Sequence, residues 1–553
     1  MLNNRYLHAI VLALLSLTNL SAQVDGLGDS GEIEDVQVEI VKDRQITLPK
    51  ASRIYDKVPP QPYDNMKSEL TYDFKSFTFD VPELEFKLLP LRLKDEPMSK
   101  LYNGYVKVGF GNYITPYFEG YINNKRDKQY SYGAHVKHLS SRNGPIEDDM
   151  SGNSENTVDL FANAYGRNAV MGGKLLYSGK NYNYYGFPTG AVVDKDTINH
   201  DFDIIKFSTD FSSSDVSNDF QYNMKFAVDH ISDNYSAKET EIKVDAESAY
   251  QISKESSAYL GFNVSSVNQS DLSFSSHSRI LVTGSPEYHF VYNSINIRAG
   301  ANFTYSNDTL GHMAKFRIYP NLEARYQISS STNVYGGLTG ETQRNTYQKL
   351  STQNPYLGLN AIVFDSNKQL VIHGGLESSI GQNMIAKAGF SYALVKNMYY
   401  FNNGIDQAKF DVLYDLGNTT VTSLFASINY SSPRGLTMLL MGELNQYSTD
   451  QIAEVWHRPQ FKMRFNSKYN LFNKVLIGAD LNVMSGIKAE NGNGGSVETL
   501  DPAIDLSFNL DYRFSDRFSA FIKLKNVISN EYEYYQFYPV RGFQVLAGVT
   551  YTF

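Results

Sequence analysis

The ten histidines are the residues best suited to catalysis or metal binding in this chain of 553 residues, which contains no cysteine. Proteases and phospholipases need a histidine held beside an aspartate or a nucleophilic serine, and no motif in the sequence fixes such a pair. His135 and His138 are three residues apart, so on a strand their side chains point to opposite faces and cannot share a metal ion. We therefore expect no catalytic residue, no metal site, no cofactor and no enzymatic activity.

Two further motifs receive structural interpretations. His457 lies in Trp456-His-Arg-Pro459, at an expected strand entrance where Trp and Tyr anchor at a lipid interface. Gly492-Asn-Gly-Gly-Ser496 has the glycines of a phosphate-binding loop, but no strand–helix unit surrounds it, and we interpret it as a mobile external loop. The net charge of -9, without a basic stripe, argues against nucleic acid as a partner.

Strict alternation of apolar and polar residues over residues 504–514 indicates which elements carry these side chains. A period of two over this length predicts a strand that crosses an outer membrane at a tilt. Similar alternation occurs throughout residues 100–553, most clearly at 157–165, 205–211 and 475–483. Strands of soluble propellers and solenoids are typically shorter and less consistently split between two faces, so a membrane barrel is favoured. After the N-terminus, no stretch approaches the roughly 20 apolar residues of a membrane helix.

The N-terminus has the residue order of a secretory signal peptide. Arg5 precedes the apolar run Ala9-Ile-Val-Leu-Ala-Leu-Leu15, and small residues follow up to Ala22. We expect residues 1–22 to be removed near Ala22, so that the mature chain begins at Gln23. This order predicts export from the cytoplasm.

The pattern of strands and turns predicts an all-β fold, an integral outer-membrane antiparallel β-barrel over residues 98–553. We count about 22 strands, within a range of 22–24, and a closed bacterial barrel needs an even number. The last strand must run down to the periplasm, and its face carries a barrel-assembly signal formed by Val549, Tyr551 and Phe553. From it, alternation assigns residues 446–455, 488–501 and 531–541 to the outside and 431–434, 470–473 and 515–516 to periplasmic turns. Residues 181–199 are expected to form the longest external loop.

The C-terminal part of the chain resembles TonB-dependent receptors. The resemblance is carried by Phe514-Ser-Asp-Arg-Phe-Ser-Ala-Phe-Ile-Lys-Leu-Lys-Asn-Val527, by Asn530-Glu-Tyr532, by Tyr538-Pro-Val-Arg-Gly542 and by the terminal strand. It implies a 22-stranded barrel with an N-terminal plug domain and an energy-coupling segment. Gly104-Tyr-Val-Lys-Val-Gly-Phe-Gly-Asn-Tyr113, His138-Leu-Ser-Ser141 and Trp456-His-Arg-Pro459 are similar to plug-less receptor-like barrels of Bacteroidetes.

The segment before the barrel departs from that family. Residues 23–97 are too few for a plug, and they combine acidic clusters with frequent prolines. We expect an extended, irregular periplasmic segment. A barrel of this width then needs another closure, which this segment, inward-facing side chains and loops, or a partner protein would supply.

A short β-forming run near the expected mature N-terminus is a candidate docking strand, since such a run can add to the sheet of a periplasmic partner. Energy coupling, docking of a partner and a passive tether all remain open for this run. Its apolar residues are Ile33, Val36, Val38, Ile40 and Val41.

Two functions from different classes follow from these features. The first is transport of a solute, with external aromatic residues contacting a glycan or another ligand. The second is a structural or accessory role in a multiprotein outer-membrane assembly. The expected partners are outer-membrane lipid, the barrel-assembly machinery and a periplasmic or surface lipoprotein; the sequence names no substrate. The candidate ligand-contact residues are Tyr182, Tyr184, Tyr185 and Phe187.

Overall fold

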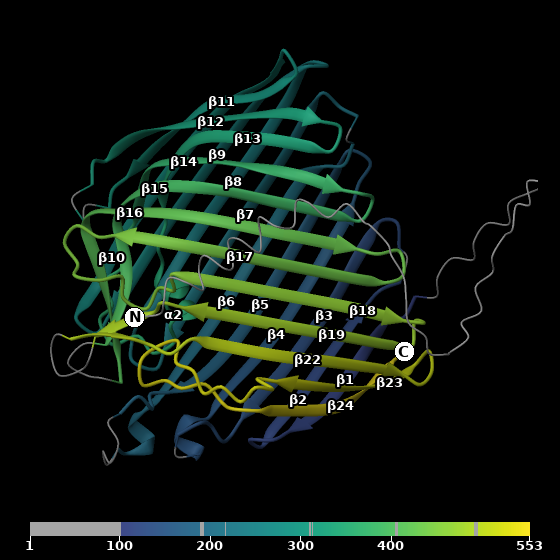
Figure 1. Ribbon diagram of the computed structural model, residues 1–553, viewed down its shortest axis with the longest axis vertical. Coiled ribbons are helices and arrows are strands. Elements are labelled where there is room, and N and C mark those ends of the chain that lie inside the picture. Colours follow the sequence, from purple (N-terminus) through teal and green to yellow (C-terminus); the bar gives the residue numbers. More distant parts are fainter. Residues whose placement is uncertain are drawn as a thin grey trace, which may run out of the picture. The chain divides into compact units, whose positions relative to one another are not determined.

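The computed structural model describes residues 101–553, apart from residues 126, 147, 188–192, 216, 309–310, 312, 404–407 and 491–495. These residues form a 22-stranded antiparallel sheet that closes on itself where β1 pairs with β24. Strands adjacent in the chain pair in turn, and β19 pairs with β22 because β20 and β21 form a separate small hairpin. Figure 1 shows the strands side by side. The predicted fold class is confirmed.

The barrel strands are β1 (Gly104–Gly111), β2 (Thr115–Asn123), β3 (Tyr130–Ser141), β4 (Asn153–Tyr165), β5 (Ala169–Asn183), β6 (Asn199–Ser213), β7 (Phe220–Asp233), β8 (Lys238–Ser253), β9 (Ser256–Asp271), β10 (Phe274–Tyr292), β11 (Ile295–Ser306), β12 (Phe316–Ser329), β13 (Thr332–Gln343), β14 (Ser366–Ile380), β15 (Met384–Asn403), β16 (Phe410–Ser431), β17 (Leu436–Ser448), β18 (Phe461–Leu471), β19 (Val475–Ser485), β22 (Ala503–Arg513), β23 (Phe518–Lys525) and β24 (Gln544–Thr552). The connections carry β20 (Lys488–Glu490), β21 (Val497–Thr499), the 3-10 turns η2 (Asp148–Ser151) and η3 (Lys195–Thr197), and the helix α2 (Tyr347–Gln353). No helix in the described part of the chain is long and apolar enough to cross a membrane.

The two faces of the barrel wall differ as the alternation predicts. On β22, the apolar side chains of Phe508, Leu510 and Tyr512 are exposed on the outer face. The inner face carries hydrogen-bonded polar groups: the carboxylate of Glu119 accepts from the Tyr105 hydroxyl at 2.9 Å. An apolar exterior around a polar interior is the arrangement of an outer-membrane barrel, in which lipid meets one face and water the other.

The closing seam depends on two glycines that face each other across β1 and β24, Gly109 and Gly548. A Cβ atom on Gly548 would lie 2.1 Å from the carbonyl oxygen of Val108 and 2.6 Å from the ring of Phe521. The buried Phe521 ring occupies the space that two side chains would fill. The seam therefore closes only with very small residues at this position.

The connections at the end of the barrel that holds Phe553 are all short, whereas every long connection lies at the other end, which makes the latter the outer mouth. The predicted division between outer loops and periplasmic turns is confirmed for the six connections assigned from the sequence. The prediction of the longest loop is wrong, because residues 344–365 form a longer connection than the one between β5 and β6. The sequence pattern missed it because its residues lie between two strands without any alternation of their own.

His135 and His138 lie on β3 with opposite orientations, as predicted. The ring of His135 faces the lumen, where its Nε2 lies 3.2 Å from Glu119 and its Nδ1 lies 3.6 Å from Asp159. Trp456 does not lie at a lipid interface, because its side chain is only 6 % exposed within the connection between β17 and β18. The sequence interpretation of this Trp is therefore corrected.

Candidate functional site

Residues 344–365, which we call the cap loop, connect β13 to β14 at the outer mouth and fold inward. The loop contains the only α-helix in the described part of the chain, α2. Thr346 is its N-cap, with a side-chain oxygen that accepts from the backbone N–H of Lys349 at 3.1 Å. Such a cap satisfies one of the free N–H groups of a helix start. A helix of two turns is too short to be stable alone, so its packing must hold it.

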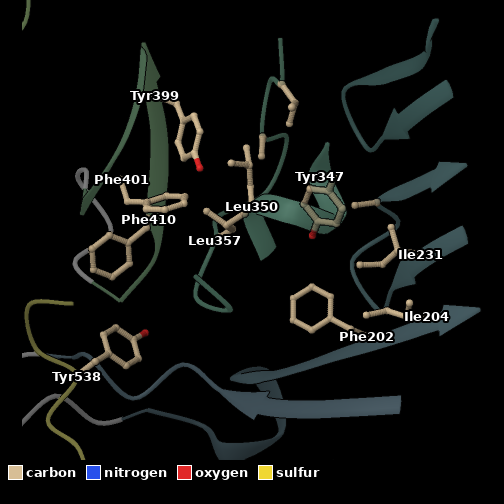
Figure 2. Packing of buried hydrophobic residues seen from close by; sticks show 13 residues of the cluster. Phe202, Ile204, Ile231, Tyr347, Leu350, Leu357, Tyr399, Phe401, Phe410 and Tyr538 are labelled. Carbon is tan, nitrogen blue, oxygen red and sulfur yellow. The ribbon is translucent and has the colours of Figure 1, made fainter. Parts of the chain in front are cut away.

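An apolar core joins the cap loop to the barrel wall on two sides. Figure 2 shows Tyr347 and Leu350 of α2 with Phe202 of β6 on one side and Phe401 of β15 on the other. Because β6 and β15 lie almost opposite each other in the ring of 22 strands, the cap loop spans the mouth. Side chains that belong to this core are Phe202, Ile204, Ile231, Ala237, Tyr347, Leu350, Leu357, Ala361, Val363, Tyr399, Phe401, Phe410 and Tyr538.

A buried cluster of charges fixes the root of the cap loop. The guanidinium of Arg279, on β10, is fully buried and lies 3.2 Å from Asp365, 3.7 Å from Asp308 and 4.0 Å from Glu239. Its Nη2 also donates to the carbonyl oxygen of Asn345 at 2.9 Å. The carboxylate of Glu239 accepts the backbone N–H groups of the first helical residues. One cation on the wall thus holds three acidic groups and the loop backbone.

The charge cluster is incompletely satisfied. Burial raises the pKa of the Asp365 carboxyl, although Arg279 and Arg344 lie beside it and act in the opposite direction. Within the described residues, Nε and Nη1 of Arg344 and Oδ2 of Asp365 make no hydrogen bond, and the Arg344 and Asp365 groups are 3.5 Å apart. The Nη1 of Arg344 and the Oδ2 of Asp365 instead form an ion pair, so Arg344 is a second cation at the root of the cap loop.

Tyrosines of neighbouring outer loops contact the cap loop, and His457 joins β15 to one of these loops. The hydroxyl of Tyr184 donates to the carbonyl oxygen of Leu357, and that of Tyr535 donates to the carbonyl oxygen of Gln353 at 2.7 Å. The Nδ1 of His457 lies 2.7 Å from the carbonyl oxygen of Phe401, and its Nε2 accepts the backbone N–H of Gln536. This pairing requires the neutral ring, and burial lowers the pKa of His457 to about 4.

The four predicted ligand-contact residues lie at the outer mouth, but in different surroundings. Tyr184 is 1 % exposed and its ring stacks on His200. Phe187 packs against the small core that contains Tyr184. Tyr182 and Tyr185 pack against the larger apolar core and also line a cavity. The structure therefore places all four residues at the outer mouth, and their contact with a ligand stays a prediction.

The cavity has a volume of about 310 Å³ and lies between the cap loop and the wall formed by β4, β5 and β22–β24. Tyr182, Tyr185 and Tyr356 supply aromatic surface, and Lys525 and Arg541 supply positive charge. Sequence reasoning missed Tyr356 and the two cations. The run of tyrosines at 532–538 was an available signal for packing at the outer mouth, because aromatic side chains in an outer loop need a partner surface.

The remaining predicted residues lie outside this site. Val549 and Tyr551 are exposed on the outer face of β24 and Phe553 follows the strand, with its carbonyl oxygen accepting the backbone N–H of Asn103 at 2.7 Å. The candidate docking strand, with Ile33, Val36, Val38, Ile40 and Val41, lies outside the described residues, as does Gly492-Asn-Gly-Gly-Ser496 apart from its serine. Among the described residues, no group of three or more His, Asp and Glu side chains is arranged to hold a metal ion.

Comparisons with known proteins place the fold. No family model matches the chain, and no curated protein sequence is similar to it. Among solved structures, the chain is similar to the FrpB iron transporter from Neisseria meningitidis, with a TM-score of 0.64, 10% identity and 82% of each chain covered. It is also similar to the siderophore receptor PirA from Acinetobacter baumannii, with a TM-score of 0.62, 10% identity and coverage of 83% of this chain and 81% of that chain.

A third similar structure is the ferripyoverdine receptor of the outer membrane of Pseudomonas aeruginosa bound to ferripyoverdine, with a TM-score of 0.60 and 10% identity over 83% of this chain and 72% of that one. The chain shares the fold of these receptors. It is an integral outer-membrane β-barrel, and the barrel expected from the sequence resemblance is confirmed. At this level of identity the likeness concerns the fold alone.

Proposed function

We propose that this protein is a gated outer-membrane transporter whose lumen opens when the cap loop leaves the mouth. The observation that carries the proposal is the cap loop itself, which bridges nearly opposite walls above a polar lumen. Barrels of 22 strands enclose a lumen wide enough to need a closure. Arg344 and Asp365 hold the root of the cap loop through an ion pair of 3.5 Å without a hydrogen bond, which supports a closure that can be released.

A disulfide that ties the cap loop to the wall tests this proposal. A Cβ atom on Gly358 would lie 3.6 Å from the Cβ of Lys409, the residue directly before β16, which is within the range of disulfides. The natural chain has no cysteine, so Gly358→Cys with Lys409→Cys gives a single possible bridge. Conductance in planar bilayers should be low when the pair is oxidised and should rise on reduction. Each single cysteine variant serves as the control, and equal conductance in both redox states would refute gating by the cap loop.

A non-transporting structural subunit is the second candidate. The observation in its favour is the full burial of Arg279 among three carboxylates, since a fixed closure would be built in this way. This function predicts no conductance from the reduced pair and co-purification of partner proteins after gentle detergent extraction. The two candidates therefore give opposite results in the same preparation.

For the segment before the barrel we propose docking to a periplasmic partner through residues 33–41, with TonB-type energy coupling as its more specific form. The support is the alternation of Val36, Val38 and Ile40 in a short β-forming run. Deleting residues 33–55 should abolish recovery of the partner while the barrel still assembles. Unchanged growth and unchanged partner recovery would remove this idea.

For the last strand we propose that the outward face of Val549, Tyr551 and Phe553 is the signal for the barrel-assembly machinery. The exposure of all three side chains on the outer face supports it. Removing Phe553 should lower the fraction of folded barrel in the membrane, measured by heat-modifiable migration on gels. Normal assembly without Phe553 would contradict this role.

A further inference from the structure

We infer that the cavity between the cap loop and the wall binds a small hydroxylated anion, of which an acidic monosaccharide is the best-fitting class. The biological role of this site rests on the proposed transport function, but ligand binding is measured independently of transport through the barrel. The volume of about 310 Å³ lies at the lower end of small-molecule sites, which span about 300–1,000 Å³.

Three polar side chains around the cavity are available to a ligand. The ammonium of Lys525 makes no ion pair or hydrogen bond with the described part of the chain, and the same holds for the hydroxyl of Tyr182 and the side-chain amide of Gln544. Neighbouring groups are used by the protein: the side-chain amide of Asn526 donates to the carbonyl oxygens of Asn530 and Arg541. Because Lys525 is exposed to solvent, its ammonium can donate to a ligand that replaces water in the cavity.

The charge of the lining selects an anion. Lys525 and Arg541 are the cations, and Asp505 is the acidic residue among the lining side chains. Arg541 donates to the carbonyl oxygens of Asn143 and Ser151, which fixes its guanidinium without neutralising it. The lining thus carries one net positive charge within a chain of net charge -9. A singly charged ligand neutralises it.

The remaining lining fits a hydroxylated ring. Tyr182, Tyr185 and Tyr532 offer aromatic surface, on which the C–H face of a sugar packs. Asp505 accepts from the hydroxyls of Ser507 at 2.8 Å and Tyr532 at 3.4 Å, and its remaining acceptor capacity can serve ligand hydroxyls. Carboxylate recognition by Lys525 and hydroxyl recognition by Asp505 would then act on the same ligand.

Calorimetric titration of the full-length detergent-solubilised protein tests the site with four probes: glucuronate, galacturonate, glucose and inorganic sulfate. We expect an acidic sugar to bind and glucose to bind at least tenfold more weakly. Lys525→Met should weaken acidic-sugar binding by about tenfold or more, because a hydrogen bond to a charged group is lost. Lys523→Met is the matched control, since Lys523 lies two residues away on the same strand and outside the cavity lining. Tyr182→Phe should cause a smaller loss.

Three results would overturn the inference. They are the absence of binding by both acidic sugars, equal binding of glucose and glucuronate, and equal loss in the Lys525 and Lys523 variants. Sulfate that binds as tightly as glucuronate would overturn the sugar assignment, because the site would then recognise charge alone. If the protein binds glucuronate but shows no conductance, the binding site is supported and the transport function is refuted. A protein that conducts after reduction of the Gly358–Lys409 cysteine pair but binds no acidic sugar refutes the site alone.

Discussion

Replacing Arg279 with Met should release the cap loop. The change leaves the buried carboxylates of Glu239, Asp308 and Asp365 with Arg344 as the remaining cation. Removing one partner of a buried ion pair costs about 3–5 kcal/mol, because the other charge remains buried without compensation. At about 1.4 kcal/mol for each factor of ten, the population of the open cap loop should rise by between about a hundredfold and several thousandfold.

Trypsin provides the assay, since Lys349 lies within α2 and its ammonium donates to the side chain of Asn345 at 2.9 Å. Cleavage after Lys349 reports the population of the open loop when the loop closes faster than the protease cuts. The membrane-embedded Arg279→Met protein should therefore be cut at least about a hundred times faster than the natural one. Heat-modifiable migration on gels verifies that the barrel is intact.

Arg298→Met is the matched control for this experiment. Arg298 also lies on the lumen side of the wall and pairs with Glu323, but its side chain is 50% exposed. Exposed pairs contribute about 1 kcal/mol or less, so cleavage after Lys349 should change little. Equal cleavage rates in the Arg279 and Arg298 variants would refute the reasoning. Combining Arg279→Met with Asp365→Leu should recover part of the lost closure, because one stranded carboxylate is removed as well.

Two further predictions concern acid and the closing seam. Burial holds the pKa of His457 at about 4, below its ordinary value of about 6.5. The closed loops at the mouth are therefore most stable above pH 6.5. Their free energy of opening falls by about 3 kcal/mol in total as the pH drops to 4. Conductance should accordingly rise between pH 7 and pH 4.5, and His457→Gln should remove that rise; a rise that persists in the variant assigns it to another group. Gly548→Ala should prevent closure of the barrel, because its Cβ meets the Val108 carbonyl, whereas Gly442→Ala, with no atom within 4 Å of its Cβ, should assemble normally on heat-modifiability gels. Folded Gly548→Ala barrels in normal yield would show that the seam can shift.

The wall of the barrel could be predicted from the sequence because the alternation within each strand shows which side chains share a face. Residues 504–514 alternate without interruption, and the strand observed there covers almost the same residues. Whether a side chain faces lipid or the lumen follows from its place in this local alternation. The facing of each residue can therefore be assigned without knowing any distant partner. The direction of the last strand then fixes which connections are outer loops, and the short turns follow from it.

The cap loop could not be predicted in the same way. Its charge cluster takes Glu239 from β8, Arg279 from β10, and Asp308 and Asp365 from two separate connections. In its own segment, each of these residues is indistinguishable from an ordinary polar residue. The four side chains come into contact only because one loop folds inward. The local signal that was available is the Thr346 N-cap before a short helical run, within residues that lack any alternation. Tyr184 shows the same limit, since its burial depends on Leu357 far along the chain.

The cap loop and the cavity share one residue, and this has a consequence for how a transporter of this design must work. Tyr356 stacks on Tyr538 with ring centroids 3.6 Å apart and also lines the cavity, so a ligand that contacts it does so only while the loop is closed. A ligand shifts an equilibrium by its difference in affinity for the two states, and this ligand favours the closed one. Binding alone therefore cannot open the mouth. Opening a loaded barrel needs free energy from another source, and docking of a periplasmic partner to residues 33–41 is the element of the proposed function that would supply it.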